Sequence, residues 1–375
     1  MTINCPTLHP QDYGVFSKTL YESIKGKRIP ISGSIEITMR CNLRCQHCYI
    51  PFSKRKGISQ RELTVAEFRR LFAEIADAGC LWLLITGGEP LLRPDFLEIY
   101  DTAKKMGFII TLFTNGTLIT KSIINHLAEF RPFSIEISLY GYSQETYENV
   151  TGIPGSFNRC MRGIELVLNR GLPLKIKSPL ILANKHEIHK TKQFVENLGL
   201  DFRFDPVINA GLDGNIGPTT SRLKPEEIVN IQGSYPEFIT DWNDNIQKST
   251  LQLKKSKNYY VCNAGKLGFH IDSYGKMYLC MVDRRVGFDL RKGSFIEGWE
   301  DFFPKLLNLE YHQDIECIGC ELRSVCAQCP AMAYLETGDP EKIVPFLCEL
   351  AHKKYFAFSK HEKLSMKRQQ IVFPD

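Results

Sequence analysis

Three cysteines stand close together near the N-terminus, in the run CNLRCQHC, where Cys41, Cys45 and Cys48 have the spacing C-x3-C-x2-C. Thiolates this close can ligate one metal centre, and three of them leave one iron of a four-iron cluster without a protein ligand. An open coordination position distinguishes a reactive metal site from a closed structural one. The alternative is a zinc site completed by His47 or by a distant residue. We favour the reactive cluster because the cysteines directly follow the first predicted strand.

A second group of seven cysteines lies in the C-terminal part of the chain. Its members are Cys262, Cys280, Cys317, Cys320, Cys326, Cys329 and Cys348. This density predicts a second, metal-stapled domain. Two zinc sites are the structural alternative, because CxxC pairs alone do not separate zinc from iron. The remaining three, Cys5, Cys80 and Cys160, are interpreted as ordinary buried or free thiols.

The composition is that of a globular protein rich in metal ligands. The chain has 375 residues, of which 43% are hydrophobic, enough for one large domain and a smaller one. Thirteen cysteines are many for a reducing compartment, and an odd number does not suit a pure disulfide framework. A formal charge of +5 with only short basic runs argues against a nucleic-acid partner. No apolar stretch approaches the roughly 20 residues of a membrane span, so we expect a cytoplasmic protein without a membrane partner.

Short apolar runs alternate with longer amphipathic runs between residues 34 and 207, which is the pattern of repeated β-α units. Six strands joined by helical crossovers imply a parallel sheet, either doubly wound or curled into a full or partial barrel. In each case we expect ligand chemistry at the C-terminal ends of the strands. The predicted strands are 34–39, 81–86, 108–113, 133–139, 174–181 and 202–207, and the predicted helices are 64–77, 95–106, 121–129, 156–169 and 184–197.

The first cysteine motif resembles the signature of the radical S-adenosylmethionine (SAM) superfamily. The resemblance implies a partial, TIM-like (β/α)6 barrel and a 4Fe–4S cluster on Cys41, Cys45 and Cys48, whose open iron is chelated by SAM. It also implies reductive cleavage of SAM to a 5′-deoxyadenosyl radical, which removes a hydrogen atom from the substrate. An electron donor of the flavodoxin or ferredoxin type is an expected partner.

The same resemblance implies a set of residues near SAM. The GGE-type turn after the second strand would bind the SAM amine, His47 would lie near the adenine, and Ser138 would contact ribose or carboxylate. A turn-forming role is expected for Asn115, because Asn-Gly readily makes a turn. Asn184 is either a SAM contact or a helix N-cap. The full expected set is His47, Gly87, Gly88, Glu89, Pro90, Asn115, Ser138 and Asn184.

The C-terminal cysteines, with Gly275 between the first two, resemble the seven-cysteine SPASM pattern of radical SAM maturases. The resemblance implies a small, cysteine-rich α+β domain with two auxiliary clusters, expected to be 4Fe–4S. One departure is the two-residue gap between Cys326 and Cys329, where the common pattern has three residues. The inner cluster then has three cysteines, and its fourth position is open or filled by another ligand. The outer cluster would be held by Cys317, Cys320, Cys326 and Cys348, and the inner one by Cys262, Cys280 and Cys329.

The combined resemblance implies a radical SAM oxidoreductase that matures a ribosomally synthesised precursor peptide, by crosslinking, epimerisation or backbone excision such as tyramine excision. Tyr140 stands where sulfatase-maturing enzymes have an aspartate, which weakens formylglycine formation as a second hypothesis. Maturation of a small, tetrapyrrole-like cofactor is a third hypothesis, and a non-catalytic zinc protein is a fourth. No catalytic acid or base is identified, and Asp283 and Tyr278 are singled out only because they lie near Cys280.

The predicted segments are an N-terminal extension (1–33), a radical SAM core (34–223), a helical linker (224–260), a SPASM domain (261–349) and a C-terminal helical tail (350–375). The 33 residues before the first predicted strand are too few for a leader-recognition domain. We therefore expect the precursor peptide to be presented by a separate leader-recognition protein.

Overall fold

The computed structural model of the chain describes residues 12–55, 61–247, 256–312 and 315–359. In these ranges one sheet has the strand order β6-β5-β4-β3-β2-β1-β7-β8-β9. Neighbours from β6 through to β7 pair in parallel, whereas β8 and β9 are antiparallel additions. The strands are β1 (Ser32–Glu36), β2 (Trp82–Thr86), β3 (Ile109–Thr114), β4 (Ser134–Ser138), β5 (Leu174–Pro179), β6 (Asp201–Asp205), β7 (Gly268–Ile271), β8 (Lys276–Tyr278) and β9 (Phe288–Asp289).

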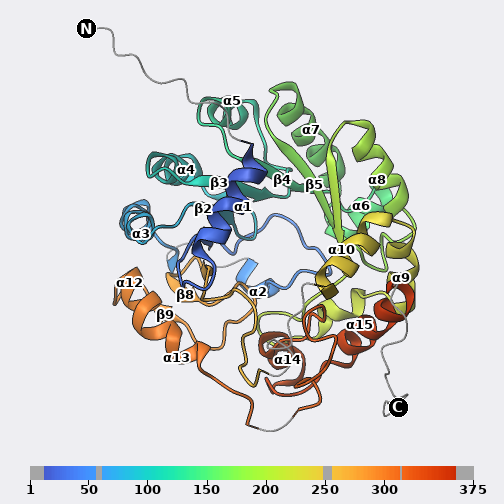
Figure 1. Cartoon of the computed structure of the whole chain (residues 1–375). Helices are drawn as coiled ribbons and strands as arrows, with labels where there is room; N and C mark the ends of the chain where they lie inside the picture. Colours follow the sequence, from blue (N-terminus) through green and yellow to red (C-terminus); the bar gives the residue numbers. More distant parts are fainter. Residues whose placement is uncertain (1–11, 56–60, 248–255, 313–314, 360–375) are drawn as a thin grey trace.

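The helices of the core lie outside the curved sheet, so the strands form an inner wall and the helices an outer ring (Figure 1). The sheet keeps two free ends, β6 and β9, and is therefore a partial barrel. This confirms the predicted fold class. The helices that connect the core strands are α2 (Phe52–Arg55), α3 (Val65–Asp77), α4 (Phe96–Lys105), α5 (Lys121–Glu129), α6 (Gln144–Thr151), α7 (Ser156–Asn169) and α8 (Ile188–Asn197), with the 3-10 turn η2 (Pro90–Leu92) after β2.

The alternation of side chains along the strands explains this layering. Ile35, Ile85 and Ile137 are completely buried against the helices, while the residues next to them, such as Glu36 and Ser138, point to the opposite face of the sheet. On the helix side, α3 buries one stripe of apolar residues at helical spacing. Each fully buried side chain of this kind stabilises the fold by about 1.5–3 kcal/mol. The lumen face is left for polar side chains.

Capping residues and glycines determine where several helices begin and end, as predicted. Thr64 and Glu67 form a capping box at the start of α3. Gly79 and Gly107 follow α3 and α4 with φ of 93° and 89°, a backbone conformation that other residues rarely adopt. The predicted start of the fifth helix at 184 is wrong, because α8 begins at Ile188 with Glu187 as its N-cap. Helix α6 was not predicted.

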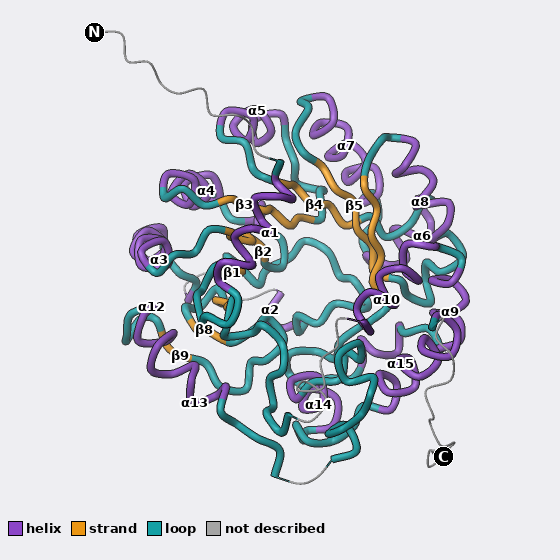
Figure 2. The backbone as a smooth tube through the Cα atoms, viewed as in Figure 1, coloured by secondary structure: helices purple, strands orange, loops and turns teal. Residues whose placement is uncertain are grey.

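An unpredicted helix, α1 (Tyr13–Ile24), lies within the expected N-terminal extension. Its Tyr13 and Phe16 rings pack against Trp82 at the start of β2, with ring centroids 6.5 and 6.3 Å apart. Figure 2 shows α1 crossing the sheet near β1 and β2. The helix therefore covers the N-terminal ends of these strands, opposite the end where ligand chemistry is expected.

The C-terminal cysteine segment shares the core sheet. Strand β7 pairs in parallel with β1, so the sheet crosses the predicted boundary at 261. The predicted linker forms helices α9 and α10, and α15 packs against both. α15 begins at Pro345, before the predicted tail at 350, with proline in its first turn. The remaining helical elements are η3 (Gly217–Ser221), α9 (Pro225–Gly233), α10 (Pro236–Gln247), α12 (Phe295–Glu297), η4 (Gly298–Phe302), α13 (Phe303–Leu307), α14 (Pro330–Thr337) and α15 (Pro345–Phe358).

Within the described ranges, every helix falls short of the length and apolar character that a membrane span requires.

Candidate functional site

The first three cysteines line one cavity of about 180 Å³ at the C-terminal ends of the core strands. The structure therefore brings together residues that lie up to a hundred positions apart in the sequence, as the strand pattern predicted. The expected site residues on its wall are Cys41, Cys45, Cys48, His47, Gly87, Gly88, Asn115 and Ser138. Three further expected residues, Glu89, Pro90 and Asn184, do not line this cavity.

The glycine turn after β2 is packed directly on the backbone that leads to Cys41. The Gly88 amide donates to the Thr38 carbonyl at 2.8 Å, and the Glu89 amide donates to the Arg40 carbonyl at 2.8 Å. A Cβ atom at Gly87 would collide with the Thr38 carbonyl oxygen, and one at Gly88 with the Arg40 carbonyl oxygen. Glycine is therefore required here by close backbone approach, which holds the turn and the cysteine loop in one unit.

Glu89 is fully buried and faces β3 rather than the cavity. Its carboxylate accepts hydrogen bonds from the Thr114 hydroxyl at 2.7 Å, the Asn115 amide at 2.7 Å and the Leu91 amide at 3.0 Å. Burial raises the pKa of Glu89 to about 7, and these hydrogen bonds oppose the shift. Pro90 is also buried and begins η2. Both residues hold the turn in position, and a contact of either with SAM stays a prediction.

Asn115 lies beside the first cysteine sulfur. Its Nδ2 is 3.9 Å from the Cys41 Sγ and donates to Asn42 Oδ1 at 2.9 Å. The Leu43 amide also donates to the Cys41 Sγ, at 3.4 Å. Donors aimed at a cysteine sulfur favour its thiolate form and tune the potential of a bound cluster. Asn115 therefore contacts Cys41, a proposed cluster ligand, in addition to its expected role in forming the turn.

Two rings close the wall next to the cysteines. His47 and Tyr140 have ring centroids 5.3 Å apart, and Tyr140 in turn lies 5.5 Å from Tyr147. Burial raises the pKa of Tyr140, and the charge of Cys45 adds to the shift, so the phenol stays protonated. Tyr140 therefore contributes a neutral side chain to this wall.

Asn184 is not the N-cap of α8 and does not line the cavity of the three cysteines, and its contact with SAM stays a prediction. Its Oδ1 accepts from the Ile181 amide at 2.9 Å, and its Nδ2 donates to the carbonyls of Tyr140 at 3.0 Å and Pro179 at 2.9 Å. The side chain is buried and lies before the Glu187 N-cap. These bonds tie the chain that follows β4 to the chain that follows β5, which is a positioning role.

Four of the C-terminal cysteines form one group. Cys317, Cys320, Cys326 and Cys348 line the same small cavity. Burial raises the pKa of Cys326 to about 12, and the charges of Cys348, Cys317 and Cys320 add to the shift. Four thiols around one cavity are the donor set of either a 4Fe–4S cluster or a zinc ion. This group is the one that the sequence assigns to the outer cluster.

The other three C-terminal cysteines form a second group. Burial is the main cause that raises the pKa of Cys329 to about 11, and the charges of Cys280 and Cys262 add to it. The Asp283 amide donates to the Cys280 Sγ at 3.4 Å, and the Met332 amide donates to the Cys329 Sγ at 3.5 Å. Cys329 therefore lies within electrostatic range of Cys280 and Cys262, and a cluster shared by these three cysteines stays a prediction.

Neither titratable residue singled out near Cys280 is available as a base. The Asp283 carboxylate accepts from Arg285 at 2.8 and 2.9 Å and from the Tyr260 hydroxyl. The Tyr278 hydroxyl donates to Asp272 at 3.2 Å. Of the three cysteines outside the N-terminal motif and the two C-terminal groups, Cys80 and Cys160 are buried as predicted and Cys5 lies outside the described residues. Among the described residues no three His, Cys, Asp or Glu side chains are arranged around a single metal ion.

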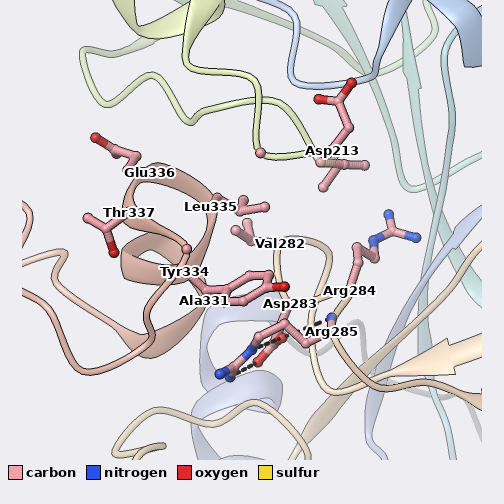
Figure 3. Close-up of a pocket in the computed structure, with 13 residues that line it drawn as sticks. Asp213, Val282, Asp283, Arg284, Arg285, Ala331, Tyr334, Leu335, Glu336 and Thr337 are labelled. Atoms are coloured by element: carbon pink, nitrogen blue, oxygen red, sulfur yellow. Dashed lines mark hydrogen bonds and ion pairs between the residues drawn. The ribbon is translucent and has the colours of Figure 1, made fainter.

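A cavity of about 550 Å³ lies between the loop after β6 and the C-terminal segment (Figure 3). The loop contributes Asp213, and α14 contributes Tyr334. The Leu212 amide donates to the Tyr49 carbonyl at 2.8 Å, so this loop is attached to the first cysteine loop. On the other side, residues 282–285 follow Cys280 directly. The cavity therefore lies between the two cysteine regions.

Comparison with known proteins agrees with the geometry of the site. A family model described as the radical SAM superfamily matches residues 35–195. An AdoMet-dependent heme synthase of Oleidesulfovibrio alaskensis is 31% identical over 81% of this chain and 83% of that protein. This chain belongs to the radical SAM superfamily. As a radical SAM protein it is an enzyme that binds SAM and a 4Fe–4S cluster.

Two further relatives differ in the substrates that their names indicate. An AdoMet-dependent heme synthase of Methanosarcina barkeri is 29% identical over 85% of this chain and 96% of that protein. A PqqA peptide cyclase of Bradyrhizobium diazoefficiens is 28% identical over 89% of this chain and 90% of that protein. The crystal structure of Streptococcus suis SuiB bound to precursor peptide SuiA shares the fold, with a TM-score of 0.66 and 16% identity over 93% of this chain and 83% of that chain.

Charged residues in the barrel lumen carry no local sequence signal that marks them as part of a site. Lys177 lines the cavity with the three cysteines, and Glu136 lies one strand away from it. Their strands read Ser-Ile-Glu-Ile-Ser and Leu-Lys-Ile-Lys-Ser-Pro, in which apolar and polar residues alternate. That alternation predicts which side chains face the lumen. It does not predict which of them lie close together, because that depends on which strands pair.

Proposed function

We propose that this enzyme uses a radical derived from SAM to remove a hydrogen atom from a ribosomally synthesised precursor peptide, which it thereby crosslinks, epimerises or shortens. The observation that carries the proposal is the cavity of about 550 Å³ between the first cysteine loop and the inner C-terminal cysteines. An extended peptide offers backbone groups and charges of both signs. The cavity wall offers both signs as well, with Asp213 on one side and the Asp283–Arg285 pair on the other (Figure 3).

The residues of the first cavity match the groups that they would have to hold. Cys41, Cys45 and Cys48 would ligate the cluster, and the glycine turn would offer its backbone to SAM. When bound, the cluster and SAM supply the 5′-deoxyadenosyl radical. The protein's part is to orient SAM and to exclude water from the radical. The half-buried His47 ring and the buried Tyr140 ring suit the second task.

We assign two auxiliary clusters to the C-terminal cysteines, with four ligands in the outer group and three in the inner group. Auxiliary clusters serve a reaction in which the substrate radical must lose an electron to reach the product. The inner group contains Cys280, next to residues 282–285 of the large cavity wall, which is where an electron acceptor for the substrate would be useful. We further propose a separate leader-recognition protein and a flavodoxin- or ferredoxin-type donor as partners.

The relatives support a peptide substrate through the PqqA peptide cyclase, which aligns with 89% of the chain. A tetrapyrrole substrate is the second candidate, because the two heme synthases are 29% and 31% identical and align with 85% and 81% of the chain. A tetrapyrrole ring would fit a flat apolar slot. The charged residues of the large cavity are instead spread over both sides of its wall, which favours the peptide.

A mass-spectrometric assay separates the two candidates. The anaerobically reconstituted enzyme, SAM and dithionite are incubated with synthetic candidate precursor peptides or with iron coproporphyrin III, a carboxylated iron tetrapyrrole. We expect a mass change in the peptide and 5′-deoxyadenosine formation that rises with peptide concentration. A mass change in the tetrapyrrole with an unaltered peptide would replace the proposed function with the second candidate.

A further inference from the structure

A smaller cavity, of about 100 Å³, adjoins the large cavity of about 550 Å³. The two cavities share Asp283 and Arg285 as lining residues, so this pair forms the partition between them. The segment from Leu279 to Val286 contributes to both walls, and it also contains Cys280. The smaller cavity therefore continues the proposed peptide site on the far side of the partition.

The lining of the smaller cavity is apolar apart from the shared partition and one phenol. Leu279 and Tyr260 are buried, whereas Val286 and Leu309 are 52% and 40% exposed. Leu306 completes the lining. Exposed apolar side chains around a concave apolar site are typical of a surface that a ligand covers. The cavity therefore suits an aliphatic side chain that comes from outside the protein.

The partition carries a balanced ion pair and a spare hydrogen-bond donor. Arg285 donates to Asp283 from Nε at 2.9 Å and from Nη2 at 2.8 Å, and Nη2 also donates to the Tyr260 hydroxyl at 2.7 Å. Within the described ranges, Arg285 Nη1 donates to no protein group. The guanidinium also lies 5.7 Å from the ring centroid of Tyr334, which lines the large cavity (Figure 3). A peptide that crosses the partition can therefore place a backbone carbonyl on Nη1 without meeting an unbalanced charge.

We propose that the smaller cavity binds a leucine, isoleucine or valine side chain of the precursor peptide while another residue of the same peptide lies in the large cavity. The bound aliphatic residue is an anchor that selects the peptide, and it is not the residue that is modified. The proposal rests on the proposed function, because it names the part of the peptide that the same site recognises. A peptide is the occupant that fits, since the cavity continues the proposed peptide site and the partition offers a donor to a backbone carbonyl.

An anchor of this kind should change KM and leave kcat as it is. Replacing the anchor residue of the peptide by alanine removes buried aliphatic surface, so KM should rise about tenfold to a hundredfold, which is about 1.4–2.8 kcal/mol at 1.4 kcal/mol per tenfold. The rate at saturating peptide should stay unchanged, because the anchor makes the same contact in the ground state and in the transition state.

Leu309→Glu tests the protein's side of the contact. An aliphatic side chain that enters the cavity would have to desolvate the new carboxylate, so peptide binding should weaken about tenfold or more. Leu309→Met keeps the rim apolar and should bind like the wild type. The matched control is Leu198→Glu at the end of α8, where an equally exposed leucine, at 39%, lines neither cavity. Iron content and SAM affinity should match the wild type in all three variants, whereas a structural defect would lower them.

The test uses the reconstituted enzyme and two readouts, of which the first needs no turnover. Its probe is an acetylated and amidated pentapeptide with photo-leucine between two pairs of glycines, and the residues that it labels on irradiation are mapped by mass spectrometry. We expect labels on residues 279–286 and 306–309. The same peptide with leucine should compete and the one with alanine should not, and the labels should be lost in Leu309→Glu but not in Leu198→Glu. The second readout is KM and kcat for an alanine scan of a synthetic candidate precursor peptide that the wild type modifies.

Three results would overturn the proposal. Labels absent from both segments of the wild type would show that an aliphatic side chain does not enter the cavity. An equal loss of labels in Leu309→Glu and Leu198→Glu would assign the effect to surface charge. An alanine scan in which no aliphatic residue outside the modified position raises KM would show that the peptide does not use the cavity. Failure of the proposed function is a separate result, because it appears as a modified tetrapyrrole and unaltered peptides, whatever the labels show.

Discussion

The buried carboxylate of Glu89 should couple the SAM-side turn to the neighbouring strand, and Glu89→Gln tests this. The carboxylate accepts three hydrogen bonds, of which the one from the Asn115 amide reaches Oε2 at 2.7 Å. In the variant the carbonyl oxygen can keep two of these partners, but the amide NH₂ then faces the Asn115 N–H. Leaving one buried donor unsatisfied costs about 1–3 kcal/mol.

The size of the effect should depend on pH in a defined direction. Burial raises the pKa of Glu89 from 4.5 to about 7, so between these values the folded protein holds a proton that the unfolded chain has released. The free energy of unfolding of the wild type therefore falls as the pH rises through this window, by up to about 3 kcal/mol at about 1.4 kcal/mol per pKa unit. Glutamine does not titrate, so the difference between wild type and variant should be larger near pH 5 than near pH 7.5.

Urea unfolding of the reduced apo-protein at both pH values measures this difference, and the iron content after reconstitution reports on the cysteine loop. The control is Glu98→Gln on α4, whose side chain is 62% exposed and 3.9 Å from Arg69. We expect the control to match the wild type. The reasoning is refuted if Glu89→Gln is as stable as the wild type at both pH values, or if its loss of stability is the same at both.

Three further changes test other contacts. Gly88→Ala should lower the free energy of unfolding in urea by about 1–3 kcal/mol, because its Cβ would meet the backbone of the cysteine loop; unchanged stability would contradict the contact. Cys348→Ala should lose about four irons per chain, while Cys80→Ala keeps the full content; equal iron in both would remove Cys348 from the ligands. Arg284→Met removes the 2.8 Å partner of the buried Glu36 carboxylate and should cost about 3–5 kcal/mol in urea unfolding, most of it recovered by adding Glu36→Gln; no recovery would mean that packing, not charge, is lost.

The cysteine groups and the strand ends could be predicted because their signals are local. The spacing of Cys41, Cys45 and Cys48 and their place after a strand are visible in a few residues. The same holds for Thr64 and its capping box. The grouping of the seven C-terminal cysteines followed from a family pattern; the structure places the four of the outer set around one cavity, and the inner set stays a prediction.

The remaining features depend on contacts between distant segments. The pairing of β7 with β1 joins strands more than two hundred residues apart, and no local pattern indicates it. The role of Asn184 is set by carbonyl groups at Tyr140 and Pro179, which only the packed strand ends bring within reach. Lys177 carries an ordinary strand signal, and its place in the cavity wall follows from which strands are its neighbours in the sheet.

The central claim is that three iron–sulfur clusters serve one radical reaction, and anaerobic reconstitution tests it most directly. Iron and sulfide are counted, and dithionite-dependent formation of 5′-deoxyadenosine is assayed for the wild type and for a variant with Cys41, Cys45 and Cys48 changed to alanine. We predict about twelve irons in the wild type, about eight in the variant and 5′-deoxyadenosine only in the wild type. Bound zinc with no 5′-deoxyadenosine from either protein would contradict the account.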